Sequence, residues 1–254
     1  MSVVGHDLLV AAGLRRTITT ARASATLDRA TIGNVVGRAL DLAMPPSCVG
    51  CGLEGRLFCD VCRPALESRL RRPGGVSIGL IAEIPAPLLQ LEWCSPFAGP
   101  VRAALHAFKY AGERRLAEPL GAALATRWRS AGVGGDLLVP VPIHADRLRE
   151  RGYDQAVLLA RVVGRDLAVP FAPILERHRP TERQFDLDRG ARSGNVAGAF
   201  RLAAGARGDR PLGGRWVVLL DDVVTTGSTL IACAATLLDA GAIGVSALTV
   251  ARER

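Results

Sequence analysis

The chain has 254 residues, of which 49% are hydrophobic, enough to form one large domain or a medium domain with a small one. Its 32 basic and 24 acidic residues leave a formal net charge of +8, which favours an anionic partner such as phosphate, a nucleotide or a nucleic acid. The longest stretch without a charged residue has 16 residues, Val223 to Leu238. A membrane-spanning helix needs about 20 mainly apolar residues. We therefore expect a globular protein without a membrane span.

The first part of the chain shows neither a clear hydrophobic period nor turn signals, and we predict a flexible extension over residues 1–34. A secretory signal is not expected, because the apolar run at 8–14 is short and follows His6 and Asp7 instead of basic residues. This favours a cytoplasmic protein, in which the cysteines would mostly stay reduced. Residues 35–43 have the pattern of a short amphipathic helix that two prolines would end.

Four of the six cysteines lie close together in the pattern C-x2-C-x7-C-x2-C, at Cys48, Cys51, Cys59 and Cys62. Each C-x2-C pair forms a tight turn that directs two thiolates to one point, and two such turns complete a tetrahedral site that suits zinc. Gly50 and Gly52 would permit the left-handed backbone of such turns. Because four thiolates leave no open position, the zinc is expected to be structural. The alternative is a redox disulfide, which normally uses one C-x-x-C pair. Cys94 and Cys233 are interpreted as buried apolar residues.

After a basic linker over residues 69–75, helical and strand patterns alternate along the chain. We expect helices over residues 100–111, 116–128, 154–167 and 228–240, and strands over residues 136–143, 171–176, 215–220 and 245–251. Asp154 is a plausible N-cap for the third helix. Strands that alternate with helices of this length predict an α/β fold with a parallel sheet covered by helices.

The sequence VVLLDDVVTTGST at residues 217–229 runs from an apolar strand into two carboxylates and then into hydroxylated residues around one glycine. A loop between a strand and a helix presents N–H groups and hydroxyls to an anion, and Gly227 lets a phosphate come close. Asp221 and Asp222 could accept hydrogen bonds from vicinal hydroxyls or help to hold Mg2+. These features predict a site for a ribose 5-phosphate. A capped helix without a ligand is the alternative, in which two carboxylates at a buried edge would be costly.

The same stretch closely resembles the phosphoribosyl pyrophosphate (PRPP) motif of type I phosphoribosyltransferases. Further segments are similar to one branch, the ComF family, and with the cysteine-bearing PPSCVGCG they extend the resemblance over residues 40–254. These segments are FKYAGERRLAEPLG at 108–121, VPVPIHADRLRERGYDQAVLLAR at 139–161, R-x3-T-x2-Q at 177–184 and R-x2-N at 192–195 followed by Phe200. The family usually shows Phe-Asn where this chain has Tyr153-Asp154, which puts a role for an amide at position 154 in doubt.

The resemblance implies a phosphoribosyltransferase-like fold, PRPP with Mg2+ as ligand, and roles for particular residues. Asp221 and Asp222 would contact the ribose hydroxyls, and the loop after them would cradle the 5-phosphate. The residues implied to bind PRPP are Asp221, Asp222, Val223, Thr225, Thr226, Gly227, Ser228 and Thr229. The loop at 142–151 would bind pyrophosphate, with Arg147 and Arg151 as anion ligands. Residues 177–196 would form a mobile hood, with polar candidates at Gln184, Arg192 and Asn195.

Lys109 is the only lysine, since the other 31 of the 32 basic residues are arginine. An ammonium is a point charge that a planar guanidinium cannot replace, so Lys109 is also a candidate catalytic residue. Chance survival of one lysine on a helix face is the alternative. For Arg147, Arg149 and Arg151 the alternative is a solvated helix, and for the arginines of 177–196 it is an ordinary surface loop.

Three hypotheses for the function remain open. The first is transfer of a phosphoribosyl group from PRPP to a nitrogenous base. The second is a non-catalytic PRPP- or nucleotide-binding protein of DNA uptake, a link to natural competence that the resemblance implies, whose zinc module docks a partner. The third is direct nucleic-acid binding, which the low aromatic content of 4% disfavours. The expected organisation is an extension at 1–34, a zinc module with linker at 35–75 and a phosphoribosyltransferase-like domain at 76–254. A homodimer is also a candidate state, because two-fold dimers are common among soluble enzymes of this size.

Overall fold

A computed structural model of the protein describes residues 45–74, 86–132, 134–178, 198–206, 208 and 212–253. These residues belong to one compact unit, Pro45–Arg254. The predicted extension at 1–34 and the predicted helix at 35–43 lie outside the described residues.

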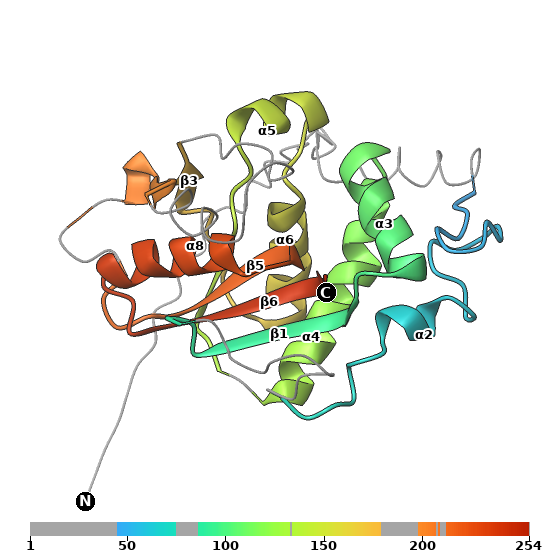
Figure 1. Cartoon of the computed structure of the whole chain (residues 1–254), viewed down its shortest axis with the longest axis horizontal. Helices are drawn as coiled ribbons and strands as arrows, with labels where there is room; N and C mark the ends of the chain where they lie inside the picture. Colours follow the sequence, from blue (N-terminus) through green and yellow to red (C-terminus); the bar gives the residue numbers. More distant parts are fainter. Residues whose placement is uncertain are drawn as a thin grey trace, which may run out of the picture. The chain divides into compact units, whose positions relative to one another are not determined.

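Four parallel strands form the central sheet (Figure 1). They are β1 (Gln90–Pro96), β2 (Leu137–Pro140), β5 (Trp216–Val224) and β6 (Gly244–Arg252), in the spatial order β1-β6-β5-β2. All but the last residue of β6 are buried, as expected for a central strand of a parallel sheet covered on both faces. The sheet confirms the predicted α/β fold class. Strand β1 was not predicted, because a buried acidic residue, Glu92, interrupts its apolar pattern.

A second, smaller sheet pairs β3 (Leu175–Arg177) with β4 (Phe200–Leu202) in antiparallel register. The prediction of a strand over residues 171–176 is therefore mostly wrong, because only its last two residues belong to β3. Phe171 makes only an isolated bridge to Leu138 of β2.

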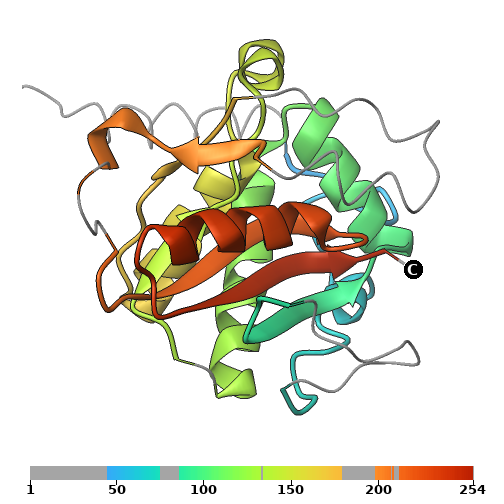
Figure 2. The ribbon, with the colours of Figure 1, turned by 60° about the vertical axis from the view of Figure 1, so that its left-hand side comes forward.

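Helices cover both faces of the central sheet, and most of them lie where the hydrophobic pattern predicted them. Two long helices, α4 (Ala117–Ala131) and α6 (Gln155–Leu167), pack together on one face, and α8 (Ser228–Asp239) lies on the other with β4 (Figure 2). The remaining elements are α2 (Arg63–Leu66), α3 (Gly99–Tyr110), α5 (Ala145–Arg151) and the short 3-10 helices η1 (Arg114–Leu116) and η2 (Ala204–Ala206). None of the helices in the described ranges is both long and apolar enough to cross a membrane.

The cysteine-rich segment shares a hydrophobic core with the sheet domain. Phe58, Leu66 and Leu70 are buried in the same cluster as Val101 and Leu105 of α3. The segment therefore packs directly on the first helix after β1, and its position follows from burial of apolar area as well as from any metal.

Three fully buried charged residues fasten this segment to the sheet. Arg127 of α4 donates from Nε to Glu92 Oε2 of β1 at 2.9 Å, and its Nη1 donates to the Arg69 carbonyl at 2.9 Å. Arg127 also donates to the carbonyls of Arg72 and Pro73. The Arg69 guanidinium lies 3.7 Å from the ring centroid of Trp93. The predicted basic linker is thus anchored to α4, because its carbonyls accept hydrogen bonds from the Arg127 guanidinium, which water cannot reach.

Candidate functional site

Strand β5 carries the two adjacent carboxylates at its carboxyl end. The prediction ended this strand at Leu220, but the parallel ladder with β6 continues through Asp221, which pairs with Thr249, to Val224. Both carboxylates therefore belong to the strand and not to the following loop, and side chains of successive strand residues point to opposite faces. The Asp221 carboxylate accepts a hydrogen bond from the backbone N–H of Asp222 at 2.8 Å.

Lys109 meets Asp222 near the carboxyl end of β5. Its Nζ atom lies 2.8 Å from Asp222 Oδ2, and only 22% and 13% of the two side chains are exposed. Burial lowers the pKa of Lys109, but attraction to Asp222 and then to Asp221 outweighs it, so the pKa is raised. The lysine is therefore a firmly charged ammonium that sits against the acidic pair, which brings together three of the predicted catalytic residues.

The Asp221 carboxyl group is harder to ionise than an ordinary aspartic acid. Burial, followed by repulsion from Asp222, raises the pKa of Asp221 to about 8, although Lys109 and the N–H of Asp222 act in the opposite direction. Burial also raises the pKa of Asp154, which has Asp222 among its charged neighbours. Carboxylates with raised pKa values at the open edge of a sheet are typical of binding and catalytic sites.

Asp154 joins the loop after β2 to the start of α6. Its Oδ1 accepts from Val157 N at 3.2 Å, which confirms the predicted N-cap, and its Oδ2 accepts from Ile143 N at 3.3 Å. The preceding Tyr153 is buried, and its hydroxyl donates to the carbonyl of Phe108 in the last turn of α3. The pair that departs from the Phe-Asn pattern of the family therefore ties α3, α6 and the loop together.

The predicted phosphate loop lies between β5 and α8. Gly227 has φ +81°, a left-handed conformation that favours glycine, and the helix begins at the next residue. The hydroxyl oxygens of Thr226 and Ser228 lie 2.8 Å apart, and both side chains of the Thr225–Thr226 pair are exposed. The first turn of α8 leaves amide N–H groups without intrahelical partners, which suits an anion. Val223 is partly buried and packs against the core.

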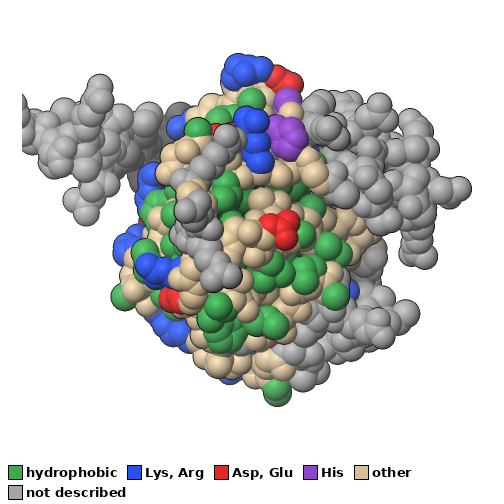
Figure 3. All heavy atoms as spheres, turned by 90° about the vertical axis from the view of Figure 1, so that its left-hand side faces the viewer, with side chains coloured by type: hydrophobic (Ala, Val, Ile, Leu, Met, Phe, Trp, Pro, Cys, Tyr) green, Lys and Arg blue, Asp and Glu red, His purple; other side chains and the backbone are tan. Residues whose placement is uncertain are grey.

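The three arginines of α5 have different surroundings. Arg149 forms an ion pair with Asp146 and is solvated, as the alternative interpretation held. Arg151 donates from Nη1 to Gln155 Oε1 at 3.1 Å. Burial lowers the pKa of Arg177 in β3, and the nearby positive charge of Arg147 lowers that pKa further. Figure 3 shows basic and histidine side chains gathered at the top of the molecule, where α5 lies.

Sequence reasoning did not single out Arg177 as a site residue, although it begins a segment similar to the ComF family. Asp221 is among the charged groups that act on its pKa, so β3 brings a further cation towards the acidic pair. A half-buried arginine near a carboxylate can be identified only from the tertiary structure. Gln184, Arg192 and Asn195, the polar candidates of the hood, lie outside the described residues.

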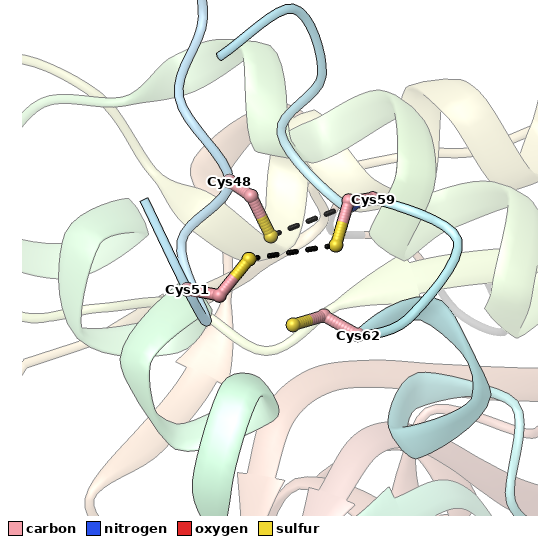
Figure 4. Close-up of side chains that lie close together, drawn as sticks. All are labelled: Cys48, Cys51, Cys59 and Cys62. Atoms are coloured by element: carbon pink, nitrogen blue, oxygen red, sulfur yellow. Dashed lines mark hydrogen bonds between the residues drawn. The ribbon is translucent and has the colours of Figure 1, made fainter. Parts of the chain in front are cut away.

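The four clustered cysteines point towards a common centre (Figure 4). Their Sγ atoms all lie within 4.8 Å of one another, and the Sγ atoms of Cys51 and Cys59 are 3.6 Å apart. A tetrahedral zinc with Zn–S bonds of about 2.3 Å separates its sulfurs by about 3.8 Å, so the donor set fits this ion. Cys94 and Cys233 are buried and lie outside the cluster, as predicted.

Backbone amides prepare one of these thiols for metal binding. Burial acts to raise the pKa of Cys48, but N–H groups of Cys59, Gly50 and Cys51 lower it to about 6. The first of these donates to Cys48 Sγ at 3.4 Å. Thiolates are the metal ligands, and N–H donors stabilise them.

The glycines of the first C-x2-C turn have different roles. Gly52 has φ +77°, so its left-handed backbone is confirmed. Gly50 does not have a positive φ, and there the prediction was wrong. A Cβ atom at position 50 would lie 2.7 Å from Cys62 Sγ and 2.8 Å from the Cβ of Pro100, so glycine is needed for close packing.

The fold and site define an α/β protein with a central parallel sheet, a pair of carboxylates at the carboxyl end of β5 and a four-cysteine cluster ahead of the sheet. No family model matches the chain. It is 31% identical to the DNA utilization protein YhgH of Escherichia coli K12 over 197 residues, which cover 75% of this chain and 82% of that protein. It is 40% identical to competence protein F of Haemophilus influenzae over 96 residues, 37% of this chain and 41% of the other. The chain therefore belongs to the family of YhgH and competence protein F, the ComF family.

Among solved structures, this chain is similar to the glutamine PRPP amidotransferase of B. subtilis complexed with ADP and GMP. The matched region covers 53% of this chain and 26% of the amidotransferase chain. The two share 22% sequence identity with a TM-score of 0.35.

Proposed function

We propose that the protein binds PRPP, or a related ribose 5-phosphate, together with Mg2+ at the carboxyl end of β5. The observation that carries this proposal is the succession of Asp221 and Asp222, the left-handed Gly227 and the start of α8. Carboxylates accept hydrogen bonds from vicinal hydroxyls, and a helix N-terminus attracts phosphate. A ligand that carries vicinal hydroxyls and a phosphate a few ångströms apart matches this order of residues.

Each part of the ligand has a counterpart in the proposed complex. Asp221 and Asp222 would bind the ribose hydroxyls, and backbone and hydroxyl groups after them would bind the 5-phosphate. These groups belong to Val223, Thr225, Thr226, Gly227, Ser228 and Thr229. Arg147 and Arg151, from the loop and helix after β2, would bind the pyrophosphate end.

Asp222 is suited to a cation, because the Lys109 ammonium already lies 2.8 Å from it. Bound Mg2+ would neutralise charge that develops on phosphate oxygens. Asp222, with Asp221, would hold it directly or through water. Lys109 would then move to the phosphates or remain as a second positive charge at the site.

Phosphoribosyl transfer is the reaction that this arrangement would serve. A nitrogen of the acceptor base would form a bond to C1 of the ribose, while the bond from C1 to pyrophosphate breaks and the base releases a proton. Negative charge would grow on the leaving pyrophosphate, where Lys109, Arg147 and Arg151 could stabilise it. No side chain needs to act as a covalent nucleophile.

A non-catalytic role in DNA uptake is the second candidate. It is supported by the names of the relatives, which refer to DNA utilization and competence. In that role the site would bind PRPP or a nucleotide without turnover, and the cysteine-rich segment would dock a partner or DNA.

Calorimetry with PRPP tests the shared part of both candidates. Wild type should bind PRPP at micromolar concentrations with Mg2+ and more weakly without it. The double variant Asp221→Asn, Asp222→Asn should lose this binding, whereas Asp239→Asn, an exposed carboxylate at the end of α8, should retain it. No binding by the wild type would contradict the proposal. Pyrophosphate release with a panel of nitrogenous bases then separates an enzyme, which turns over with one of them, from a binding protein.

We further infer that the cysteine cluster holds one structural zinc ion. Thiolates kept in a metal site are compatible with the reducing cytoplasm that the sequence predicts. Metal analysis of protein prepared without oxygen should find about one zinc per chain. Cys59→Ser should lose the metal, and Cys94→Ala, which removes a buried thiol outside the cluster, should keep it. A wild-type protein without metal would contradict the inference.

A further inference from the structure

An exposed aromatic ring follows Lys109 at the end of α3. Tyr110 is 66% exposed, whereas the other tyrosine, Tyr153, is buried. Its ring centroid lies 4.8 Å from that of His106, one turn earlier on the same helix, at an interplanar angle of 50°. Two aromatic rings therefore stand side by side on the surface of the helix whose Lys109 pairs with Asp222.

An arginine from a different element contacts the same ring. The guanidinium carbon of Arg151, the last residue of α5, lies 5.1 Å from the Tyr110 centroid. Gln155, which is buried, holds this guanidinium by accepting from its Nη1 at 3.1 Å. Because the supporting amide is fixed in the protein, Arg151 keeps its direction without a ligand.

The end of α3 is itself held in place from the opposite side. The Tyr153 hydroxyl donates to the carbonyl of Phe108, and the two rings lie 6.1 Å apart. Lys109 is bound to Asp222. Tyr110 thus projects from a rigid turn between the proposed ribose site and α5, and its exposure does not come from a loose chain end.

We propose that Tyr110, together with His106 and Arg151, forms a platform on which the nucleobase of a mononucleotide stacks. This rests on the proposed function, because the ribose and phosphate of the same nucleotide would occupy the site at Asp221, Asp222 and the loop before α8. The platform gives that site a preference for ligands that carry a base.

The chemistry of the platform fits a nucleobase better than other partners. A base offers a flat π face to an aromatic ring and to a guanidinium plane, and it accepts hydrogen bonds from the latter. An apolar peptide segment would gain nothing from the charge of Arg151, and an acidic one would gain nothing from two rings.

The rings of one tyrosine and one histidine provide a stacking surface for a single base. A groove for single-stranded nucleic acid instead combines successive aromatic side chains with a basic track. On the described part of the chain, Tyr110 is the one aromatic residue among the large hydrophobic side chains that are exposed. We therefore assign the platform to a mononucleotide.

Titration of nucleoside 5′-monophosphates against ribose 5-phosphate tests the platform. For the wild type, the Kd of at least one nucleoside monophosphate should be lower than that of ribose 5-phosphate by about 5- to 150-fold, the range of base–aromatic stacking. Tyr110→Ala should remove this difference and leave the affinity for ribose 5-phosphate unchanged, and Tyr110→Phe should restore most of it. Ile243→Ala, an exposed apolar residue just before β6, should behave as the wild type.

The possible outcomes separate this inference from the proposed function. If ribose 5-phosphate and PRPP bind but no nucleoside monophosphate binds more tightly, the platform is wrong and the site stands. If Tyr110→Ala weakens ribose 5-phosphate equally, the ring has a structural role and the platform is wrong. If none of these ligands binds, both proposals fail. A parallel titration with oligonucleotides of increasing length would overturn the mononucleotide assignment if Tyr110-dependent affinity rose with length.

Discussion

Lys109 and Asp222 form an ion pair at the carboxyl end of β5, with 2.8 Å between Nζ and Oδ2. The pair joins the last turn of α3 to a strand that is distant in the sequence. It places the only lysine of the chain against the acidic residues of the PRPP-like motif. This cation lowers the cost of keeping two adjacent carboxylates at a partly buried edge.

Removal of the ammonium should destabilise the protein. Lys109→Met leaves Asp221 and Asp222 without their nearest cation, and we expect a loss of about 1–2 kcal/mol, limited by the partial exposure of the pair. Urea unfolding at pH 7 measures the difference. Lys109→Arg should recover part of the loss, and Arg102→Met, an exposed residue on the same helix, should change stability by less than about 0.5 kcal/mol. Equal effects of the two methionine variants would contradict a role for the pair.

The pH dependence of stability should reveal Asp221. Burial and Asp222 raise the pKa of Asp221 in the folded protein to about 8, above its ordinary value of 3.8. Between these values the folded state holds a proton that the unfolded state has released, so the contribution of Asp221 to stability falls as pH rises from about 4 to about 8.

Asp221→Asn cannot ionise and should remove this contribution. We expect the variant to be more stable than wild type by about 1–3 kcal/mol at pH 9 and nearly equal to it at pH 4.5. Thermal unfolding at the two pH values, with Asp239→Asn as control, measures the effect. A constant difference between the two pH values would show that Asp221 titrates normally.

Gly50 should be required by the space around the cysteine cluster. In Gly50→Ala the new Cβ would lie 2.7 Å from Cys62 Sγ and 2.8 Å from Pro100 Cβ, so a thiol or helix α3 must shift. We expect a loss of about 1–3 kcal/mol and faster release of metal to a chromogenic chelator. Gly205→Ala, where nothing lies within 4 Å of the added carbon, is the matched control. If both variants release metal at the wild-type rate, the close contact is not needed.

The buried arginine of α4 should be the costliest of these residues to replace. Arg127→Met removes the closer of the two buried cations beside Glu92 and leaves only Arg69, whose Nη2 lies 3.8 Å from Glu92 Oε2. It also removes donors from three carbonyls of residues 69–73, and we expect a loss of about 3–5 kcal/mol. Unfolding by urea, with Arg161→Met on the exposed side of α6 as control, measures it. The double variant Arg127→Met, Glu92→Gln should lose less than the sum of its single variants. Additive losses would contradict the pairing.

Much of the fold could be predicted because its signals are local. Helices α3, α4, α6 and α8 follow from apolar residues repeated with the period of a helix, and the Asp154 cap follows from a short polar side chain just before such a repeat. The residues of the cysteine cluster could be identified from spacing alone, because each C-x2-C turn brings its own two sulfurs together.

Other features depended on partners that are far away in the chain. Strand β1 was missed because Glu92 looks like a surface residue until Arg127 is seen beside it. The end of β5 was placed too early because carboxylates suggest a loop, whereas the ladder with β6 continues past them. The role of Gly50 was misjudged because its neighbour Pro100 belongs to another helix.

The sequence by itself identified the carboxylate pair, the loop after it and the four cysteines as candidates, since these are short motifs whose spacing carries their chemistry. The tertiary structure decided how the site is completed: Lys109 against Asp222, Tyr153 on Phe108, and Arg151 over Tyr110. These contacts join segments that meet only when the sheet and its helices bury their apolar faces together. Long-range packing selects such pairs, and no local pattern of residues records them.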